Sequence, residues 1–120
     1  MLKNIETVEN KAKESNTGTR LYRGVLITRE GLKSYLEEVF IKEGLEDQIE
    51  IAEKTITCES NFLWYADNGI SFGVAQFTPD TWKDFGEGDI FNPHIQLRTM
   101  AKMFKMGLQN RWDCYKMLNK

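Results

Sequence analysis

The sequence predicts a mainly α-helical domain with one irregular segment between its second and third helices. Apolar residues recur at spacings of three and four in several stretches, which indicates amphipathic helices. The pairs Thr78-Pro79 and Asn92-Pro93 each give the cap-then-proline signal of a helix start. Residues 60–77 are instead rich in turn-forming residues. With 120 residues, the chain has the length of one domain with a single core.

The chain is expected to begin with a polar tail, residues 1–20, followed by a folded domain, residues 21–120. The tail is charged and polar, with one weak helical pattern at 4–14. Residues 21–27 are apolar and lead into the first clear helix. No signal-peptide core is visible, and no apolar run approaches the roughly 20 residues that span a bilayer. We therefore expect no transmembrane segment.

Two helices should come first in the domain. Thr28 is a suitable cap for a helix over 29–43, and Gly44 is a suitable stop. Its apolar face is formed by Leu32, Tyr35, Leu36, Val39 and Phe40. A second helix is expected over 46–59, with an acidic first turn that suits the positive end of the helix dipole. Glu59 then lies at or near its C-terminal end.

The irregular segment contains Asn68-Gly69, a strong turn dipeptide. The alternation in GISFGVAQF, which follows it, fits either a short strand or an extended loop. After this segment the cap signals and apolar spacing predict helices over 79–85, 93–107 and 109–118.

Composition argues against several classes of function. The formal net charge is −2, so a strongly basic nucleic-acid footprint is absent and no nucleic-acid partner is expected. One histidine and two cysteines fall short of the four ligands of a closed zinc site, so we expect no metal and no other cofactor. His94 is expected at the surface. The acidic patch Asp84, Glu87 and Asp89 has a spacing that fits no calcium loop.

The two cysteines, Cys58 and Cys114, leave two alternatives open. They are either buried free thiols or a disulfide. A disulfide would close a loop of roughly 55 residues, worth about 4 kcal/mol in the chain-entropy account, and would imply an oxidising compartment. Because Cys58 directly precedes Glu59, a disulfide would also hold the final helical segment beside Glu59 if that segment packs there.

Glu59 is the candidate for chemistry that the residues themselves suggest. It lies where an amphipathic helix meets the turn-rich segment, close in sequence to Ile56, Phe62 and Trp64. Apolar neighbours that desolvate a carboxylic acid raise its pKa, so that it can stay protonated and donate to a leaving oxygen. Cleavage of a glycosidic bond requires such a donor. The plainer alternative is a solvated glutamate at a helix end.

The motifs around Glu59 resemble a known family. Glu59-Ser60-Asn61-Phe62 is followed by SFGVAQ at 71–76 and by the helix start PDT at 79–81. This combination resembles the lytic transglycosylase domain of the soluble (SLT) type, in the lysozyme-like superfamily and similar to goose-type lysozyme. Downstream, the segment 89–93 resembles the family's entry to its next helix, with Gln96-Leu97 at corresponding positions. The resemblance covers about 45–116 and implies a lysozyme-like helical domain with its cleft at the irregular segment.

The resemblance implies an activity on peptidoglycan glycan strands. Glu59 would protonate the glycosidic oxygen between N-acetylmuramic acid and N-acetylglucosamine and then take the proton of the muramoyl 6-hydroxyl. That hydroxyl attacks the anomeric carbon, which gives a 1,6-anhydro sugar without water. The substrate places the protein in the bacterial cell envelope, periplasmic or extracellular, and we expect a monomer.

Four further residues are substrate-binding candidates by the same resemblance. Ser71 and Gln76 match family positions that line the site, although a turn-capping serine and a glutamine satisfied within the fold remain open. Phe77, like Trp64 and Tyr65, either stacks on a sugar or belongs to the core. Tyr115 is the candidate for a family tyrosine, although the chain ends RWDCYKMLNK where many members carry an Ala-Tyr-Asn-Gly-like segment.

Two other functions stay open. Asp67 could be the second carboxylate of a hydrolase that inverts, about 6.5–9.5 Å from the acid, or simply the residue that forms the turn before Asn68. Alternatively, the domain binds glycan or serves a structural role without turnover. Retention of Glu59, Ser71 and Gln76 argues against the last possibility, because a pure binding domain does not need an acid there.

Overall fold

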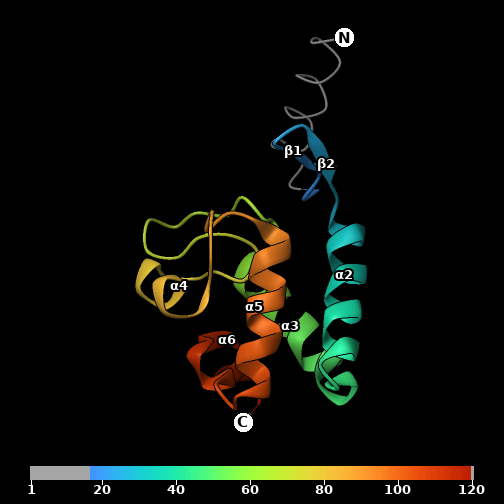
Figure 1. Cartoon of the computed structure of the whole chain (residues 1–120), viewed down its shortest axis with the longest axis vertical. Coiled ribbons are helices and arrows are strands. Elements are labelled where there is room, and N and C mark those ends of the chain that lie inside the picture. The colour runs from blue at the N-terminus through green and yellow to red at the C-terminus, as the bar shows by residue number, and fades with distance from the viewer. Residues whose placement is uncertain (1–16, 120) are drawn as a thin grey trace.

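The computed structural model describes residues 17–119, which are mainly helical (Figure 1). The helical prediction 4–14 therefore lies outside the described residues. In chain order the elements are the strands β1 (Arg20–Tyr22) and β2 (Val25–Ile27) and the helices α2 (Arg29–Lys42), α3 (Ile49–Ser60), α4 (Pro79–Phe85), α5 (Pro93–Lys105) and α6 (Asp113–Leu118). Short 3-10 helices, Glu46–Gln48 and Gln109–Arg111, precede α3 and α6.

The strands β1 and β2 form an antiparallel hairpin that the sequence analysis did not predict. Leu21 pairs with Leu26, and the turn at Arg23-Gly24 has positive φ at both residues (49° and 82°). Two consecutive residues of this kind match the right-handed twist of a tight hairpin. Since β1 begins at Arg20 and the buried Gly18 precedes it, the fold includes residues that were expected in the tail.

Tyr22 anchors the hairpin to two loops that are distant in sequence. Its ring packs edge-on against Trp64, with ring centroids 5.3 Å apart. Its hydroxyl donates a hydrogen bond to Asp89 Oδ2 at 2.8 Å, and Arg23 Nη2 lies 3.6 Å from the same oxygen. Asp89 thus serves as a structural acceptor rather than as part of an acidic patch.

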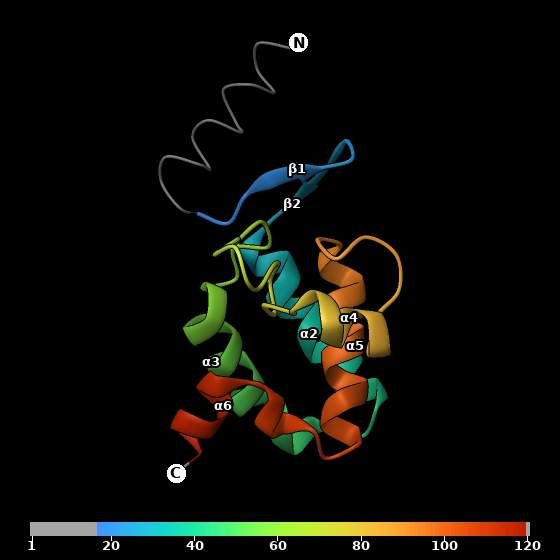
Figure 2. The same ribbon diagram turned by 90° about the vertical axis from the view of Figure 1, so that its left-hand side faces the viewer.

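The helices form two packed pairs. Helix α2 runs beside α5, while α3 packs against α6 at the other side of the domain (Figures 1 and 2). The rings of Phe40 on α2 and Phe104 on α5 meet edge to face at 5.3 Å. The core continues through fully buried side chains, which include Leu32, Leu36, Ala52, Ile56, Phe62, Val74, Leu97, Met100 and Met103.

Local capping explains where three helices start, as the sequence predicted. Thr28 Oγ1 accepts from Gly31 N at 3.0 Å, and Thr78 Oγ1 accepts from Thr81 N at 3.3 Å. Asn92 Oδ1 accepts from the backbone N–H of the second and third residues of α5. Each cap satisfies donors that the first turn leaves without a partner.

The helix predicted over 109–118 is interrupted in the structure. Trp112 has an extended backbone, with φ −97° and ψ 119°, between the 3-10 helix and α6. This break lets its indole Nε1 reach Ala75 O at 2.8 Å, so a tertiary hydrogen bond accounts for the interruption. Within the helix predicted over 46–59, the first three residues form a 3-10 turn and the α-helix begins at Ile49. The helix predicted over 93–107 ends at Lys105.

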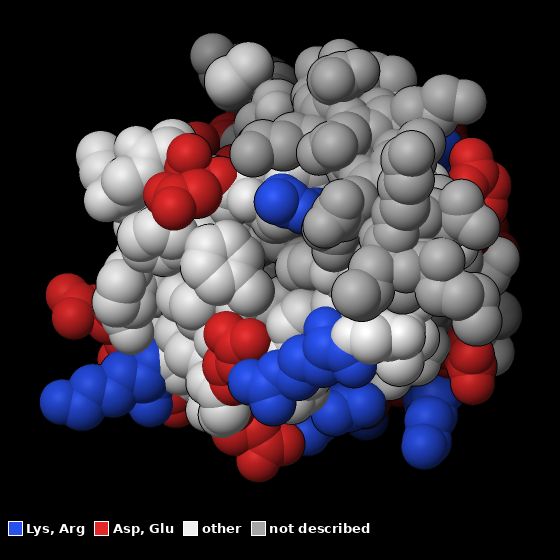
Figure 3. All heavy atoms as spheres, turned by 90° about the horizontal axis from the view of Figure 1, so that it is seen from above, with Lys and Arg blue, Asp and Glu red and all other residues white. Residues whose placement is uncertain are grey.

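Both acidic and basic side chains lie on the described part of the face seen in Figure 3. Between residues 17 and 119, no helix combines the length and apolar character needed to cross a membrane.

Candidate active site

Glu59 lies one residue before the end of α3 and is half-buried. Its Oε2 accepts a hydrogen bond from the backbone N–H of Cys114, in the first turn of α6, at 3.2 Å. Burial raises the pKa of Glu59, and the nearby Asp113 carboxylate raises it further, while the Cys114 hydrogen bond opposes both. The environment therefore shifts Glu59 toward its protonated form relative to a solvated helix-end glutamate.

A disulfide joins the residues on either side of this carboxyl. Cys58 and Cys114 are bonded, with their Cα atoms 6.0 Å apart. The structure therefore has the disulfide rather than two free thiols. Cys114 is buried, whereas Cys58 is exposed at the surface. The bond connects the last turn of α3 to the first turn of α6 beside Glu59.

Ser60, next to Glu59, ties the end of α3 to the irregular segment. Its Oγ donates to Val74 O at 2.5 Å. The helix ends because Asn61 adopts the left-handed conformation, with φ 54°, where its N–H still bonds Ile56 O. The segment beyond is an irregular loop with isolated bridges at Phe72 rather than a strand.

Gln96 on α5 fixes the other side of this loop. Its Oε1 accepts from Ala75 N at 2.8 Å, and its Nε2 donates to Phe72 O at 2.8 Å and also to Ile90 O. The side chain is fully buried. The sequence indicates Gln96 only as a position within the resemblance described above. The sequence signal for its structural role is the position of a polar side chain beside the apolar residues Ile95 and Leu97 of this helix.

Gln76 lies at the end of this loop with a positive φ of 53°. Its Nε2 donates to Gly73 O at 2.9 Å and Ala66 O at 3.3 Å, which fits the alternative of a glutamine satisfied within the fold. Gln76 also lines a small cavity of about 50 Å³, together with Phe77, Thr78, Thr81, Met103, Arg111 and Trp112. Trp112 directly precedes α6, so this cavity and the Glu59 carboxyl both border the start of that helix.

Phe77 is corrected from a substrate-binding candidate to a core residue. Its side chain is 2% exposed and packs edge-on against Trp82 and Trp112, so neither ring face is free for a sugar. Trp64, at 5% exposure, is also a core residue. Tyr65 is half-buried under the guanidinium of Arg20, which lies 4.4 Å from its ring centroid.

The two remaining substrate-binding candidates, Ser71 and Tyr115, lie in the irregular loop and on α6. Ser71 is half-buried, and its N–H donates to Asn68 Oδ1 at 2.7 Å, within the predicted turn. Tyr115 follows Cys114 on α6, is half-buried and packs against Phe104, with ring centroids 5.7 Å apart.

Asp67 is exposed and has a structural contact of its own. Its Oδ1 accepts from the backbone N–H of Gly69 at 2.8 Å, the hydrogen bond that closes the turn. This contact fits the turn-forming alternative for Asp67.

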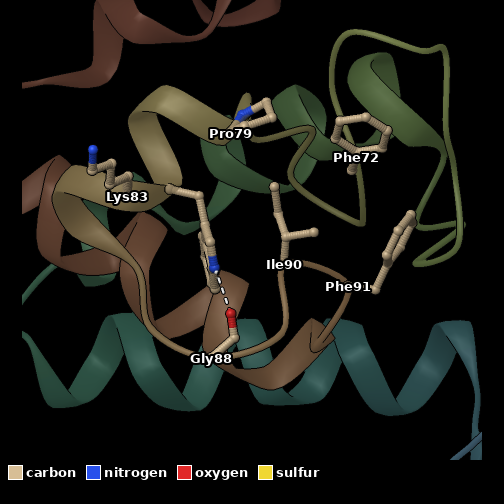
Figure 4. Close-up of a pocket in the computed structure, with 7 residues that line it drawn as sticks. Phe72, Pro79, Lys83, Gly88, Ile90 and Phe91 are labelled. Carbon is tan, nitrogen blue, oxygen red and sulfur yellow. Dashed lines mark hydrogen bonds between the residues drawn. The ribbon is translucent and has the colours of Figure 1, made fainter.

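A larger and mostly apolar pocket of about 450 Å³ lies elsewhere and does not include Glu59. Its lining residues are Phe72, Pro79, Trp82, Lys83, Gly88, Ile90 and Phe91. In Figure 4, Phe72 and Phe91 lie on one side of Ile90, and Lys83 lies on the other. Trp82 Nε1 donates to Gly88 O at 2.9 Å, so the indole N–H in this wall already has a hydrogen-bond partner.

Residues 17–119 bring together no group of three or more His, Cys, Asp or Glu side chains that could hold a metal ion. His94 is half-buried rather than at the surface, because its ring packs edge-on against Tyr35 of α2 at 4.7 Å.

Comparison of the chain with models of protein families, with curated proteins and with solved structures found no match.

Proposed function

We propose that this protein is a lytic transglycosylase with a lysozyme-like fold, which cleaves the β-1,4 bond between N-acetylmuramic acid and N-acetylglucosamine in peptidoglycan. The observation that carries the proposal is the environment of Glu59. A half-buried acid with a raised pKa stands at the end of α3, and Ser60 beside it is bonded to the loop that carries Gln76. The sequence motifs of these same residues resemble that family.

In the proposed reaction, the protonated Glu59 carboxyl donates its proton to the glycosidic oxygen as the bond to the muramoyl C1 breaks. The carboxylate then removes the proton of the muramoyl 6-hydroxyl, whose oxygen attacks C1 and closes the 1,6-anhydro ring. Glu59 is thereby protonated again and no water is consumed. The Cys114 N–H supports this cycle because it can stabilise the carboxylate between the two proton transfers.

The contact of Asp67 favours this reaction over hydrolysis. A hydrolase that inverts needs a second carboxylate to activate water, and Asp67 Oδ1 is instead engaged by Gly69 N. A transglycosylase needs only one carboxylate, since the substrate supplies the nucleophile. The Cys58–Cys114 disulfide supports an oxidising location such as the cell envelope, and we propose that the protein acts there as a monomer.

Mass spectrometry of purified peptidoglycan digested by the wild type and by Glu59→Gln tests the proposal. Products that end in anhydromuramic acid, lighter by one water than reducing-end products and absent with the variant, are expected. The variant should keep its fold, measured by circular dichroism, and should still sediment with peptidoglycan.

Reducing-end products from the wild type would instead identify a hydrolase, and Asp67→Asn would then be the next variant to digest. A wild type that binds peptidoglycan without releasing products between pH 4 and pH 8 would indicate a glycan-binding domain.

A further inference from the structure

The start of α6 is attached near Glu59 by two hydrogen bonds and a disulfide, in addition to its packing on α3 and the contacts of Trp112 and Tyr115 with Phe104. Trp112 Nε1 bonds Ala75 O, the Cys114 N–H bonds Glu59 Oε2, and the disulfide bonds Cys114 to Cys58. Helix α6 has only six residues, and no side chain caps its N-terminus. So short a helix has little stability of its own, which means that these contacts hold it in place.

The disulfide and the hydrogen bond act on the same residue. Cys114 is bonded covalently through its side chain and donates to Glu59 through its backbone. The covalent partner, Cys58, is the residue directly before Glu59. The sulfur bridge therefore restricts the distance between the donor and the carboxylate that accepts from it.

We propose that the Cys58–Cys114 disulfide is a positioning element for Glu59, so that reduction switches the site off while the domain stays folded. This inference rests on the proposed function of Glu59. A dithiol delivers two electrons and two protons, the sulfur–sulfur bond breaks, both cysteines become thiols and the reductant becomes a disulfide. Helix α6 then loses its covalent cross-link to α3, and Cys114 N is no longer held within hydrogen-bonding distance of Glu59.

Access and packing are consistent with this switch. Cys58 is exposed, so a reductant can reach its sulfur. The packing of α2 on α5 through Phe40 and Phe104 does not depend on the bridge, because neither helix contains a cysteine. Phe104 also packs against Trp112 and Tyr115, so these ring contacts remain after reduction. The protein would therefore have much lower activity in a reducing compartment and gain activity on oxidation.

The pH dependence of activity distinguishes a loss of Glu59 positioning from a general loss of domain stability. Asp113 is the charged group that faces Glu59 in the described residues, and its Oδ1 pairs with Lys116 Nζ at 3.2 Å. When α6 moves away, Glu59 loses burial and the Asp113 field, which both raise its pKa, as well as the Cys114 hydrogen bond, which lowers it. Burial is the largest of these, so the pKa of Glu59 should fall.

Because the acid must be protonated to act, a lower pKa moves the loss of activity at rising pH to lower pH. We expect kcat on peptidoglycan fragments to fall about tenfold to a hundredfold on reduction, with little change in KM. The double variant Cys58→Ser with Cys114→Ser should match the reduced wild type and should not respond to dithiol. Val39→Ala, which opens a cavity in α2, provides a destabilised control that should keep kcat and the pH profile below its melting temperature.

A second measurement does not depend on turnover. In the oxidised full-length protein, the amide resonance of Cys114 should shift with the ionisation of Glu59. After reduction that shift should be lost, while the amide resonances of α2 and α5 stay unchanged.

If neither Glu59 nor the Cys114 amide responds to reduction, the inference is wrong even if the wild type cleaves peptidoglycan. If activity falls only as the domain unfolds, or falls equally in Val39→Ala, the inference is also wrong. If the wild type shows the amide response without cleaving peptidoglycan, the proposed function fails and the positioning contact remains.

Discussion

The side chain of Gln96 fills the space in which a Cβ atom on Gly73 would stand. A Cβ built on Gly73 lies 2.6 Å from Gln96 Cδ, and the backbone at Gly73 has a φ of 89°. The glycine therefore meets two requirements at once, an unusual backbone conformation and close approach to a buried amide. Gln96 can bond Phe72 O and Ala75 N on either side of Gly73 only because no side chain intervenes.

Gly73→Ala should destabilise the domain by about 3 kcal/mol or more, because backbone strain and a steric clash act together. Urea unfolding followed by circular dichroism measures this change. Gly69→Ala is the matched control, since Gly69 also has a positive φ (83°) but nothing lies within 4 Å of an added Cβ. It should cost about 1–2 kcal/mol, which is the backbone contribution alone. Equal losses in the two variants would contradict the packing argument.

Gln96→Leu should cost about 2–4 kcal/mol, because it leaves the buried Ala75 N–H and the Ile90 carbonyl without their partner and removes one of the two hydrogen bonds to Phe72 O. The same unfolding measurement applies. Gln109→Leu is a suitable comparison, since Gln109 is half-buried and its Nε2 donates to Gln48 Oε1 and Phe104 O. It should lose about 1 kcal/mol. If Gln96→Leu were as stable as the wild type, the amide would have no role in holding the loop.

Glu59→Gln should become increasingly more stable than the wild type as pH rises from 4 to 7. Burial raises the folded-state pKa of Glu59 above its ordinary value of 4.5, so the folded state binds more protons than the unfolded state in this range. The contribution of Glu59 to stability is present below pH 4.5 and is lost as pH rises through the folded pKa. Gln does not titrate and can still accept from Cys114 N. Parallel curves of melting temperature against pH would show that burial does not perturb Glu59.

His94→Phe should reduce the loss of stability between pH 7 and pH 5. Burial, with a smaller effect of Arg98, lowers the folded-state pKa of His94 below its ordinary value of 6.5. Its contribution is therefore present above pH 6.5 and is lost as pH falls toward the folded pKa. Phe keeps a ring against Tyr35 without a titrating group. The urea midpoint of the variant should therefore rise relative to that of the wild type as pH falls from 7 to 5, and a constant difference would contradict the prediction.

The features that the sequence predicted well are governed by neighbouring residues. The helix starts after Thr28, Thr78 and Asn92 depend on side chains that bond the next turn, and this information is local. The turn at Asn68-Gly69 is local in the same sense. Such features can be predicted from a single sequence because the interacting residues lie within one turn of each other.

The features that sequence reasoning missed depend on residues far apart in the chain. The hairpin is held in place by the hydrogen bond from Tyr22 to Asp89, which lies 67 residues away in the chain. The sequence of residues 21–27 contains no information about this distant contact. His94 is half-buried because Tyr35 on another helix covers it. The sequence alone leaves both sugar stacking and the core open for Phe77, and the positions of Trp82 and Trp112 decide between them.

The disulfide also has a topological consequence. Cys58 and Cys114 are 56 residues apart, and Glu59, Gln76 and Gln96 all lie between them. A protease that cuts once inside this interval, for example at the exposed Asn68-Gly69 turn, would leave two fragments joined by the sulfur bridge. Such a nicked molecule would migrate as one species under non-reducing conditions and as two after reduction. The residues of the candidate site would thus remain in one covalent unit after a backbone cut.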